Sequence, residues 1–372
     1  MRLPGLEKAF KRAVIRLFDF MIPADIHHPR EIDPRAVKSI LVVRQHDQLG
    51  DLLLSTPAIQ ALRRHFPEAR ITVIARHYTY GVLLNNPDID RLLIFPEKLK
   101  LATPRRLWSL IKGLADHYDL AVVLNTVSHS LSSDILAWLS GARWRLGSSE
   151  HPFSPNRSSP FYNLFSPVPD QRLHETRRNL RILEFIGVEA DDLGEKMVLS
   201  LKEREFGEEI LWRHHLLPEK TVGLNLGAYK MPNRWPYQKY AALADWLVGE
   251  LGFQVAVFWG PKEEDLGELF LGAVNAEVTP LPGLDIRQLA GVLSRLRMVV
   301  CNDTGIMHLS AALGTPTFAI FGQNDPEYWR PLNRNFYGVW GPDKTRASAE
   351  LETVKSGIMR LLDRTQYQGQ DL

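Results

Sequence analysis

Short apolar runs alternate with amphipathic segments along most of this chain. In the first half, four such runs each end at a polar turn: residues 39–43, 71–75, 92–95 and 120–124. Runs of this length are typical of parallel strands that are buried on both faces. Residues 52–66 and 108–115 lie between them and have the apolar spacing of helices. The alternation predicts βαβ units in a doubly wound sheet.

The second half of the chain repeats this pattern. Its predicted strands are residues 221–226, 253–259, 298–300 and 317–321. Helices are predicted at residues 237–251 and 285–296 between these strands. We therefore expect an α/β protein with two Rossmann-like, doubly wound domains that face each other across a cleft, a preferred position for ligands.

The remaining segments suggest where the domains begin and end. Residues 147–176 contain several Pro, Ser and Asn residues and are expected to be a loop, and residues 174–186 form a predicted helix before Gly187. We expect four parts, namely an amphipathic helix with a linker, an N-terminal domain, a C-terminal domain, and a final helix with a tail. Their expected ranges are 1–36, 37–190, 191–345 and 346–372.

The N-terminal helix has a basic face and an apolar face. Its apolar residues follow helical spacing from Leu3 to Met21, and Pro23 ends the pattern. Such a helix can lie in a membrane interface and attract anionic lipid. It can equally pack on its own domain with the charged face in water. The pattern alone leaves both interpretations open for residues 1–22.

Composition excludes several classes of protein. The 372 residues favour two domains, and a net charge of +2 is too small to indicate a nucleic-acid-binding protein. The single cysteine, Cys301, excludes an intrachain disulfide and a Cys-rich zinc site, and we expect it to be a small buried residue. No apolar run reaches the about 18–20 residues that span a bilayer. We expect a cytoplasmic protein.

The most distinctive motif follows the apolar run at residues 298–300. It reads Asp303-Thr304-Gly305-Ile306-Met307-His308 and opens a predicted helix. In open α/β sheets, ligands bind beyond the carboxyl ends of strands, where the free N–H groups of a helix N-terminus can bind phosphate. The motif therefore indicates a site for a nucleoside diphosphate. The alternative is that Asp303 and Thr304 only cap the helix.

Further motifs occur in a fixed order around this one. The first half carries Arg44 to Asp51 and then Ser55 to Arg63. The second half carries Gly227, Arg234-Trp235-Pro236, Gly260-Pro261 with Glu263-Glu264, the motif at 303–308, and Phe321-Gly322. Together, over residues 38–331, they resemble glycosyltransferase family 9, the ADP-heptose:lipopolysaccharide heptosyltransferase family.

The resemblance implies a GT-B fold that binds the acceptor mainly on the N-terminal domain and the nucleotide-sugar on the C-terminal one. The implied reaction is an inverting, metal-independent transfer of heptose from ADP-heptose to a lipopolysaccharide core. It would take place at the cytoplasmic face of the bacterial inner membrane, with no metal and no cofactor. Two alternatives stay open, namely another nucleotide-sugar donor, and a GT-B protein that binds nucleotide or glycan without catalysis.

The acceptor side of the resemblance centres on Asp51. An inverting transfer needs a base that takes the proton from the acceptor hydroxyl, and Asp51 resembles the family's catalytic aspartate. The alternative is an acid that stabilises a helix N-terminus, which is compatible with catalysis. Gly50 would let the backbone approach the ligand, and Arg44 is expected near the acceptor.

The donor side comprises residues of the second half. Thr304 and Gly305 would offer N–H groups to the diphosphate, and Asp303 would orient donor hydroxyls. The other expected donor-binding residues are Gly227, Lys230, Arg234, Glu264 or its neighbour Glu263, Leu284 and His308. For three of these we weighed a purely structural role, namely a solvated acid at 264, a core leucine at 284 and a buried, hydrogen-bonded histidine at 308.

One position departs from the family pattern. Many members have a lysine two residues before the Trp-Pro pair, where it meets the diphosphate, and this chain has Asn233 there. Arginine can bind phosphate through two hydrogen bonds, whereas lysine is a point charge. We therefore predict that Arg234 or Lys230 replaces the missing lysine.

Overall fold

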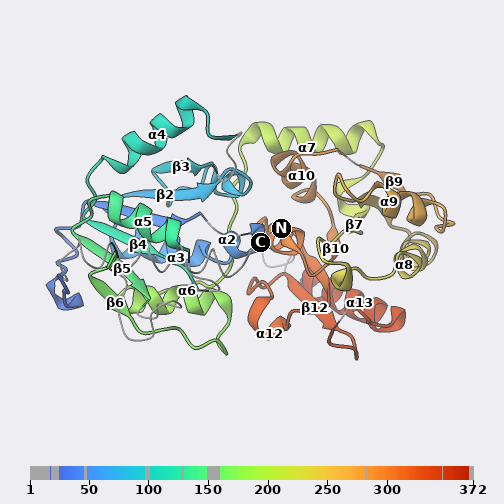
Figure 1. The fold of residues 1–372 in the computed structure, drawn as a ribbon. Helices are drawn as coiled ribbons and strands as arrows, with labels where there is room; N and C mark the ends of the chain where they lie inside the picture. Colours follow the sequence, from blue (N-terminus) through green and yellow to red (C-terminus); the bar gives the residue numbers. More distant parts are fainter. Residues whose placement is uncertain are drawn as a thin grey trace. The chain divides into compact units, whose positions relative to one another are not determined.

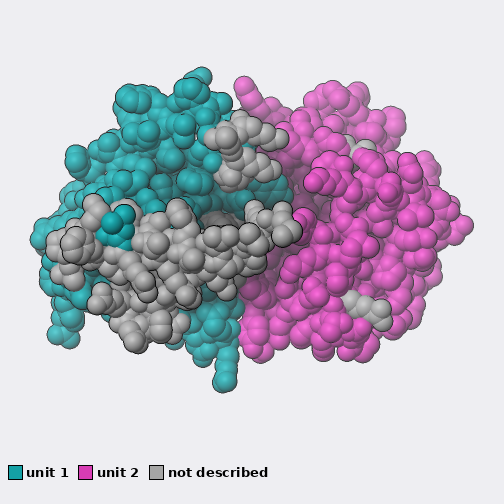
Figure 2. Space-filling view, viewed as in Figure 1, with its two compact units in different colours: residues 1–193 teal, residues 194–372 magenta. Residues whose placement is uncertain are grey.

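The chain divides into two compact units, residues 1–193 and 194–372 (Figure 2). The computed structural model describes residues 17, 25–45, 48–96, 101–126, 130–148, 160–281, 283–345 and 347–367. The predicted amphipathic helix lies outside the described residues, except for Leu17. The units meet in sequence between Leu193 and Gly194, three residues beyond the expected end of the first domain.

Unit 1 contains a parallel sheet of six strands in the order β3-β2-β1-β4-β5-β6 (Figure 1). The strands are β1 (Ser39–Arg44), β2 (Arg70–Arg76), β3 (Arg91–Phe95), β4 (Leu120–Val123), β5 (Trp144–Ser148) and β6 (Leu164–Ser166). The helices are α2 (Leu49–Leu53), α3 (Thr56–His65), α4 (Pro104–Leu114), α5 (Leu131–Leu139) and α6 (Glu175–Glu184). The chain reverses its direction of winding between β1 and β4, which therefore form the topological switch point.

Unit 2 has the same topology. Its six parallel strands have the order β12-β11-β10-β7-β8-β9, with the switch point between β7 and β10. The strands are β7 (Thr221–Asn225), β8 (Gln254–Phe258), β9 (Thr279–Pro280), β10 (Met298–Asn302), β11 (Thr317–Phe321) and β12 (Phe336–Trp340). The helices are α7 (Leu201–Arg213), α8 (Tyr237–Gly249), α9 (Glu264–Leu271), α10 (Ile286–Leu293), α11 (Gly305–Ala312), α12 (Pro326–Trp329) and α13 (Leu351–Tyr367).

The apolar runs of the sequence form the central strands, as predicted. Val43 and Leu41 of β1 pack in one core with Leu110 of α4 and Leu136 of α5. In unit 2, the side chain of Trp235 is buried in the core and its indole N–H donates to the carbonyl of Ala349 at 2.8 Å. Cys301 is completely buried, as expected. The predicted helix at 174–186 forms α6, and Gly187 follows it with φ +81°.

Two predictions were wrong in detail. The expected loop at 147–176 contains β6, a strand of three residues at the edge of the sheet. Strands this short give too little alternation to detect. The predicted helix at 52–66 is interrupted between α2 and α3, where the hydroxyls of Ser55 and Thr56 donate to the carbonyls of Leu52 and Leu53 at 2.6 and 2.7 Å.

Candidate functional site

Asp51 lies just beyond the carboxyl end of β1, beside the switch point of unit 1. It occupies the first turn of α2, and its Oδ2 accepts a hydrogen bond from the backbone N–H of Gln48 at 3.1 Å. The side chain is half-buried, and Gly50 precedes it. The expected helix-capping role of Asp51 is thus present and engages Oδ2.

A buried ionic cluster lies beneath Asp51. The guanidinium of Arg44 donates to Oε1 of Glu175 at 3.2 Å and to the carbonyl oxygen of Asp51 at 3.3 Å. Glu175 also accepts a hydrogen bond from the hydroxyl of Thr126 and pairs with Arg178 at 3.1 Å. Burial raises the pKa of Glu175, the positive charge of Arg44 lowers it, and Asp51 raises it further.

This cluster gives Arg44 a structural role. Its side chain is fully buried and holds the backbone of Asp51. The expected position of Arg44 near the acceptor stays a prediction. Glu175 could not be recognised from the sequence, because 131 residues separate it from Arg44 and nothing in the local pattern joins them.

In unit 2, the turns after β7 and β8 are joined by one carboxylate. Oε2 of Glu263 accepts from the backbone N–H of Gly260 at 2.8 Å, and Oε1 pairs with the guanidinium of Arg234 at 2.9 Å. A Cβ atom added to Gly227 would lie 1.8 Å from Oε2 of Glu263, so any larger residue there would have to displace the Glu263 carboxylate. Arg234 also donates to the carbonyl of Ala228 at 2.8 Å.

The structure distinguishes the two adjacent glutamates. Glu264, the residue chosen from the sequence, is exposed and accepts a hydrogen bond from the indole N–H of Trp259 at 3.0 Å. Glu263 instead reaches Gly227 and Arg234. Glu263, the N-cap residue of α9, has its side chain directed back to the turns, whereas the side chain of Glu264, the first residue of the helix, contacts Trp259. Which of the two glutamates binds the donor stays a prediction.

Asp303 follows β10 at the switch point of unit 2 and is 6% exposed. Burial raises the pKa of this carboxyl group to about 6, although His308 and the amide of Asn324 lower it. Oδ2 of Asp303 accepts from Nδ2 of Asn324 at 2.9 Å. Thr304 caps α11, and its hydroxyl oxygen accepts from the N–H of Ile306 at 3.3 Å. The capping role weighed for this motif is observed for Thr304, and Gly305 opens the helix.

Asn233 is a buried link to Asp303. Its Nδ2 donates to Oδ2 of Asp303 at 3.2 Å, and its Oδ1 accepts from the N–H of Gln323 at 3.0 Å. Lys230, three residues earlier, is exposed, and its positive charge lowers the pKa of Asp303. Of the two cations predicted to replace the family lysine, Arg234 is thus engaged by Glu263, while Lys230 is exposed near Asp303.

His308 is buried and bonded to an acid that the sequence analysis did not find. Its Nδ1 lies 2.8 Å from Oε1 of Glu195, and burial raises the pKa of Glu195 while His308 lowers it. Asn333 fixes the backbone of Glu195 through hydrogen bonds of 3.1 and 3.0 Å. The expected structural alternative, a buried and hydrogen-bonded histidine, is therefore observed, and His308 also lowers the pKa of Asp303 in the same motif.

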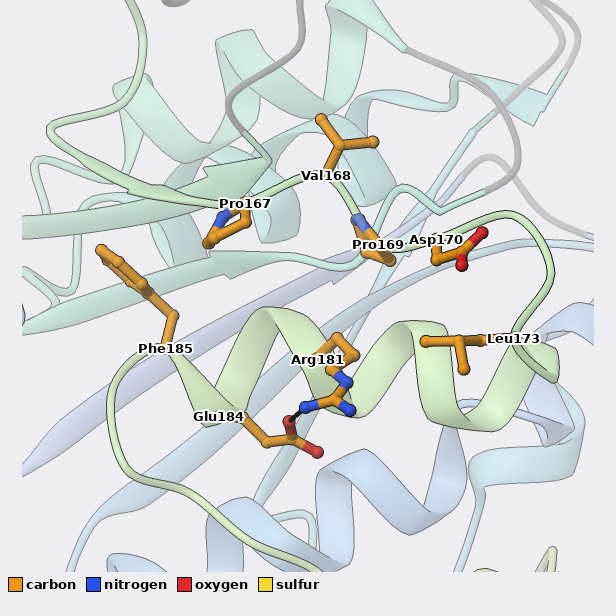
Figure 3. Close-up of a pocket in the computed structure, with 8 residues that line it drawn as sticks. All are labelled: Pro167, Val168, Pro169, Asp170, Leu173, Arg181, Glu184 and Phe185. Atoms are coloured by element: carbon orange, nitrogen blue, oxygen red, sulfur yellow. Dashed lines mark hydrogen bonds and ion pairs between the residues drawn. The ribbon is translucent and has the colours of Figure 1, made fainter.

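Leu284 is half-buried and lies just before α10, which Asp285 caps. Its expected packing on adenine stays a prediction. A separate, open pocket of about 560 Å³ lies in unit 1 and contains none of the predicted site residues (Figure 3). It is lined by Pro167, Val168, Pro169, Asp170, Leu173, Arg181, Glu184 and Phe185.

The described residues contain no group of three or more His, Cys, Asp or Glu side chains that could hold a metal ion. None of the helices within the same ranges is long and apolar enough to cross a membrane.

Comparison with known proteins gives consistent results. Residues 107–357 match the model of glycosyltransferase family 9 (heptosyltransferase). A lipopolysaccharide heptosyltransferase 3 of Escherichia coli is 28% identical over 310 residues, which cover 79% of this chain and 86% of the relative.

Solved structures agree on the fold. A family 9 glycosyl transferase from Veillonella parvula has a TM-score of 0.77 at 22% identity, covering 90% of this chain and 98% of that one. The E. coli ADP-heptose lps heptosyltransferase II has a TM-score of 0.70 at 22% identity, covering 88% and 99%. The α/β class and the GT-B fold expected from the sequence are confirmed.

Proposed function

The chain belongs to glycosyltransferase family 9, and on that premise we propose that it transfers heptose from ADP-heptose to a lipopolysaccharide core acceptor. The named relative is a lipopolysaccharide heptosyltransferase. The observation that carries the proposal within this chain is the arrangement around Asp303. A buried acid and a capped helix N-terminus follow β10, and an exposed lysine follows the neighbouring strand β7. That combination suits a nucleoside diphosphate that leaves with negative charge.

We assign the donor to unit 2. The N–H groups at the start of α11 would receive the diphosphate, with Lys230 as the cation. Glu263 is the acid best placed for a donor hydroxyl, because it bridges the turns after β7 and β8. Arg234 would first have to share or release Glu263 in order to bind phosphate. Lys230 is therefore our preferred replacement for the family lysine.

We assign the base to unit 1. In an inverting transfer, the acceptor hydroxyl oxygen attacks the anomeric carbon while the bond from that carbon to the diphosphate oxygen breaks. Asp51 would take the hydroxyl proton, and ADP would leave with the bonding electron pair. The buried pair of Arg44 and Glu175 would keep the Asp51 backbone in place during the reaction.

We further propose that the enzyme works at the inner face of the bacterial inner membrane, as a peripheral protein. The support is chemical, since an acceptor that carries lipid is held at a membrane surface. Residues 1–22 remain a candidate contact, because their predicted basic amphipathic helix has the pattern of an interfacial segment.

Calorimetry with ADP, UDP and GDP tests the donor. We expect the wild type to prefer ADP, and Asp303→Ala to weaken ADP binding by about tenfold or more, because it removes the buried carboxylate that accepts from the amides of Asn233 and Asn324. Asp363→Ala, an exposed acid of the same unit, is the matched control and should bind ADP like the wild type. A preference for UDP or GDP would refute the donor, and no binding by folded protein would refute the activity.

Transfer kinetics then test the base. Asp51→Asn keeps a group that can accept the Gln48 hydrogen bond but cannot take a proton. We expect kcat to fall by about 10²–10⁴ with little change in ADP affinity. An activity within a few-fold of the wild type would remove Asp51 from the reaction.

A further inference from the structure

Helix α4 of unit 1 has more apolar surface than the core uses. Its inner face packs against β3 through Leu110 and Leu114, which are buried. Gly113 belongs to the same face, and a Cβ atom added to it would lie 2.6 Å from the side chain of Leu93. This face alone accounts for the attachment of α4 to the sheet.

A second apolar face of α4 is exposed. Leu107, Trp108 and Ile111 are exposed by 39%, 67% and 59%. At about 100° per residue, these three side chains fall within a sector of about 100° on the helix. Large exposed apolar side chains that gather on one helix face mark an interaction surface, whereas single ones need no explanation. We call these three residues the α4 apolar face.

Basic residues border this face. Arg105 and Lys112 are exposed, and the helix also contains Arg106 but no acidic residue. Among the described residues, no ion pair involves Arg105 or Lys112. The first acid after the helix, Asp116, is paired with Arg91. The charge around the α4 apolar face is therefore positive, and Asp116, which is paired with Arg91, does not compensate it.

We propose that the α4 apolar face and its basic border dock on an anionic lipid bilayer. Apolar side chains inserted at the level of the headgroups gain by leaving water, and Trp is favoured at that depth. Arg and Lys beside them gain from anionic lipid. A protein partner would not require a border that is purely basic, so the charge favours the lipid surface.

The position of α4 suits this role. It lies beside β3, the edge strand of the sheet, and connects β3 to β4 (Figure 1). Because those strands are parallel, α4 runs antiparallel to them. Its first residue, Pro104, therefore lies on the side of the sheet formed by the carboxyl ends of the strands, as Asp51 does. The inference rests on the proposed function in one respect, because a lipid-linked acceptor would require the carboxyl ends of these strands to approach a membrane.

Vesicle sedimentation of the full chain tests the proposal. The vesicles contain either phosphatidylcholine alone or phosphatidylcholine with phosphatidylglycerol. We expect stronger binding to the anionic vesicles and a decrease of about tenfold or more in the partition coefficient of Trp108→Ser/Ile111→Ser. Arg105→Gln/Lys112→Gln should lose about tenfold on anionic vesicles and become less sensitive to salt.

The matched control is Trp212→Ser on α7, because Trp212 is 78% exposed in the other unit and has no such basic border. It should bind vesicles within about twofold of the wild type. Equal binding by the wild type and Trp108→Ser/Ile111→Ser would overturn the proposal, as would an equal loss in Trp212→Ser. A wild-type dimer that this double substitution dissociates, without vesicle binding, would assign the face to a second copy instead.

Two further measurements distinguish a failure of the docking surface from unfolding of a variant and from a failure of the proposed function. Each variant is melted to show that it is folded, which we expect because the substituted side chains are mostly exposed. ADP binding is measured on the same preparations and should not change. If the wild type binds anionic vesicles through α4 but binds no nucleotide, the proposed function fails and the docking surface stands.

Discussion

Asp303→Asn is expected to change how the stability of unit 2 depends on pH. Burial raises the pKa of this carboxyl group to about 6 in the folded chain, and the nearby His308 and Asn324 oppose that effect. Asparagine has nearly the same shape and can still accept the hydrogen bonds from Asn233 and Asn324 through its single amide oxygen. The substitution therefore removes the titration while it disturbs packing little.

The sign follows from proton binding. Between the ordinary pKa of 3.8 and about 6, the folded chain keeps a proton on Asp303 that the unfolded chain releases. The stability that Asp303 contributes is thus highest below about pH 4, falls as the pH rises through about 6, and is constant above about pH 7. At about 1.4 kcal/mol for each pH unit between the two pKa values, the total loss is about 3 kcal/mol.

Urea unfolding, followed by circular dichroism between about pH 4 and about pH 8, measures this effect. Other groups also titrate in this range, so the informative quantity is the difference between the wild type and Asp303→Asn at each pH. We expect this difference to shift by about 3 kcal/mol in favour of the variant as the pH rises. Asp363→Asn, an exposed acid on α13, should follow the wild type. Parallel profiles for the wild type and Asp303→Asn would refute the reasoning.

Two other predictions concern carboxylates that the structure revealed. Glu195→Ala should destabilise the protein by about 1–3 kcal/mol more than Glu195→Gln, because only the alanine removes the hydrogen-bond partner that Glu195 gives to Nδ1 of His308. Thermal melts of both variants measure this difference in stability. Equal losses of stability would contradict the prediction. Gly227→Ala should displace Glu263, whose oxygen lies 1.8 Å from the new Cβ, and weaken ADP binding in calorimetry. In the combined Gly227→Ala/Glu263→Ala variant, the stability lost to the clash should return. The control is Gly249→Ala, whose new Cβ meets nothing within 4 Å and should cause no clash. A Gly227→Ala protein that binds ADP normally would contradict the prediction for Gly227.

The sequence was sufficient to predict the fold because its signals are local. Each central strand is a short apolar run, and each polar turn after it is visible without tertiary information. That is why Asp51 after β1 and Asp303 after β10 could both be expected at the carboxyl ends of strands, where the topology has its switch points. The elements that were missed include β5 and β12, of five residues each, helix α7, of thirteen residues, and the edge strands β6 and β9, which have only three and two residues. The pairing of these two edge strands depends on a neighbouring strand rather than on their own pattern.

The acids that orient the site could not be predicted in the same way. Arg44, Arg234 and His308 were each expected at the site, and the structure pairs each with a carboxylate. Of these three acids, only Glu263 was named from the sequence, as the alternative to Glu264. The partners are Glu175, Glu263 and Glu195, which lie 131, 29 and 113 residues away in sequence. A glutamate in a sequence usually indicates a solvated surface, and only tertiary contact turns it into a buried partner. Ion pairing across such distances carries no periodic or local signal.

Asn233 shows how contacts between residues distant in sequence affect a functional assignment. From the sequence, a missing lysine at this position left Arg234 and Lys230 as equal candidates. In the structure Asn233 is a neutral link between Asp303 and Gln323, so the site has adapted to an amide there. Arg234 already neutralises Glu263, and a second anion would have to compete for it. Among the described residues, no hydrogen bond or ion pair involves the Lys230 ammonium, whose charge already acts on Asp303. We therefore propose that Lys230, three residues towards the N-terminus from Asn233, supplies the positive charge for a diphosphate. The charges of Lys230 and His308 lower the pKa of Asp303, and the burial of this carboxyl group outweighs them.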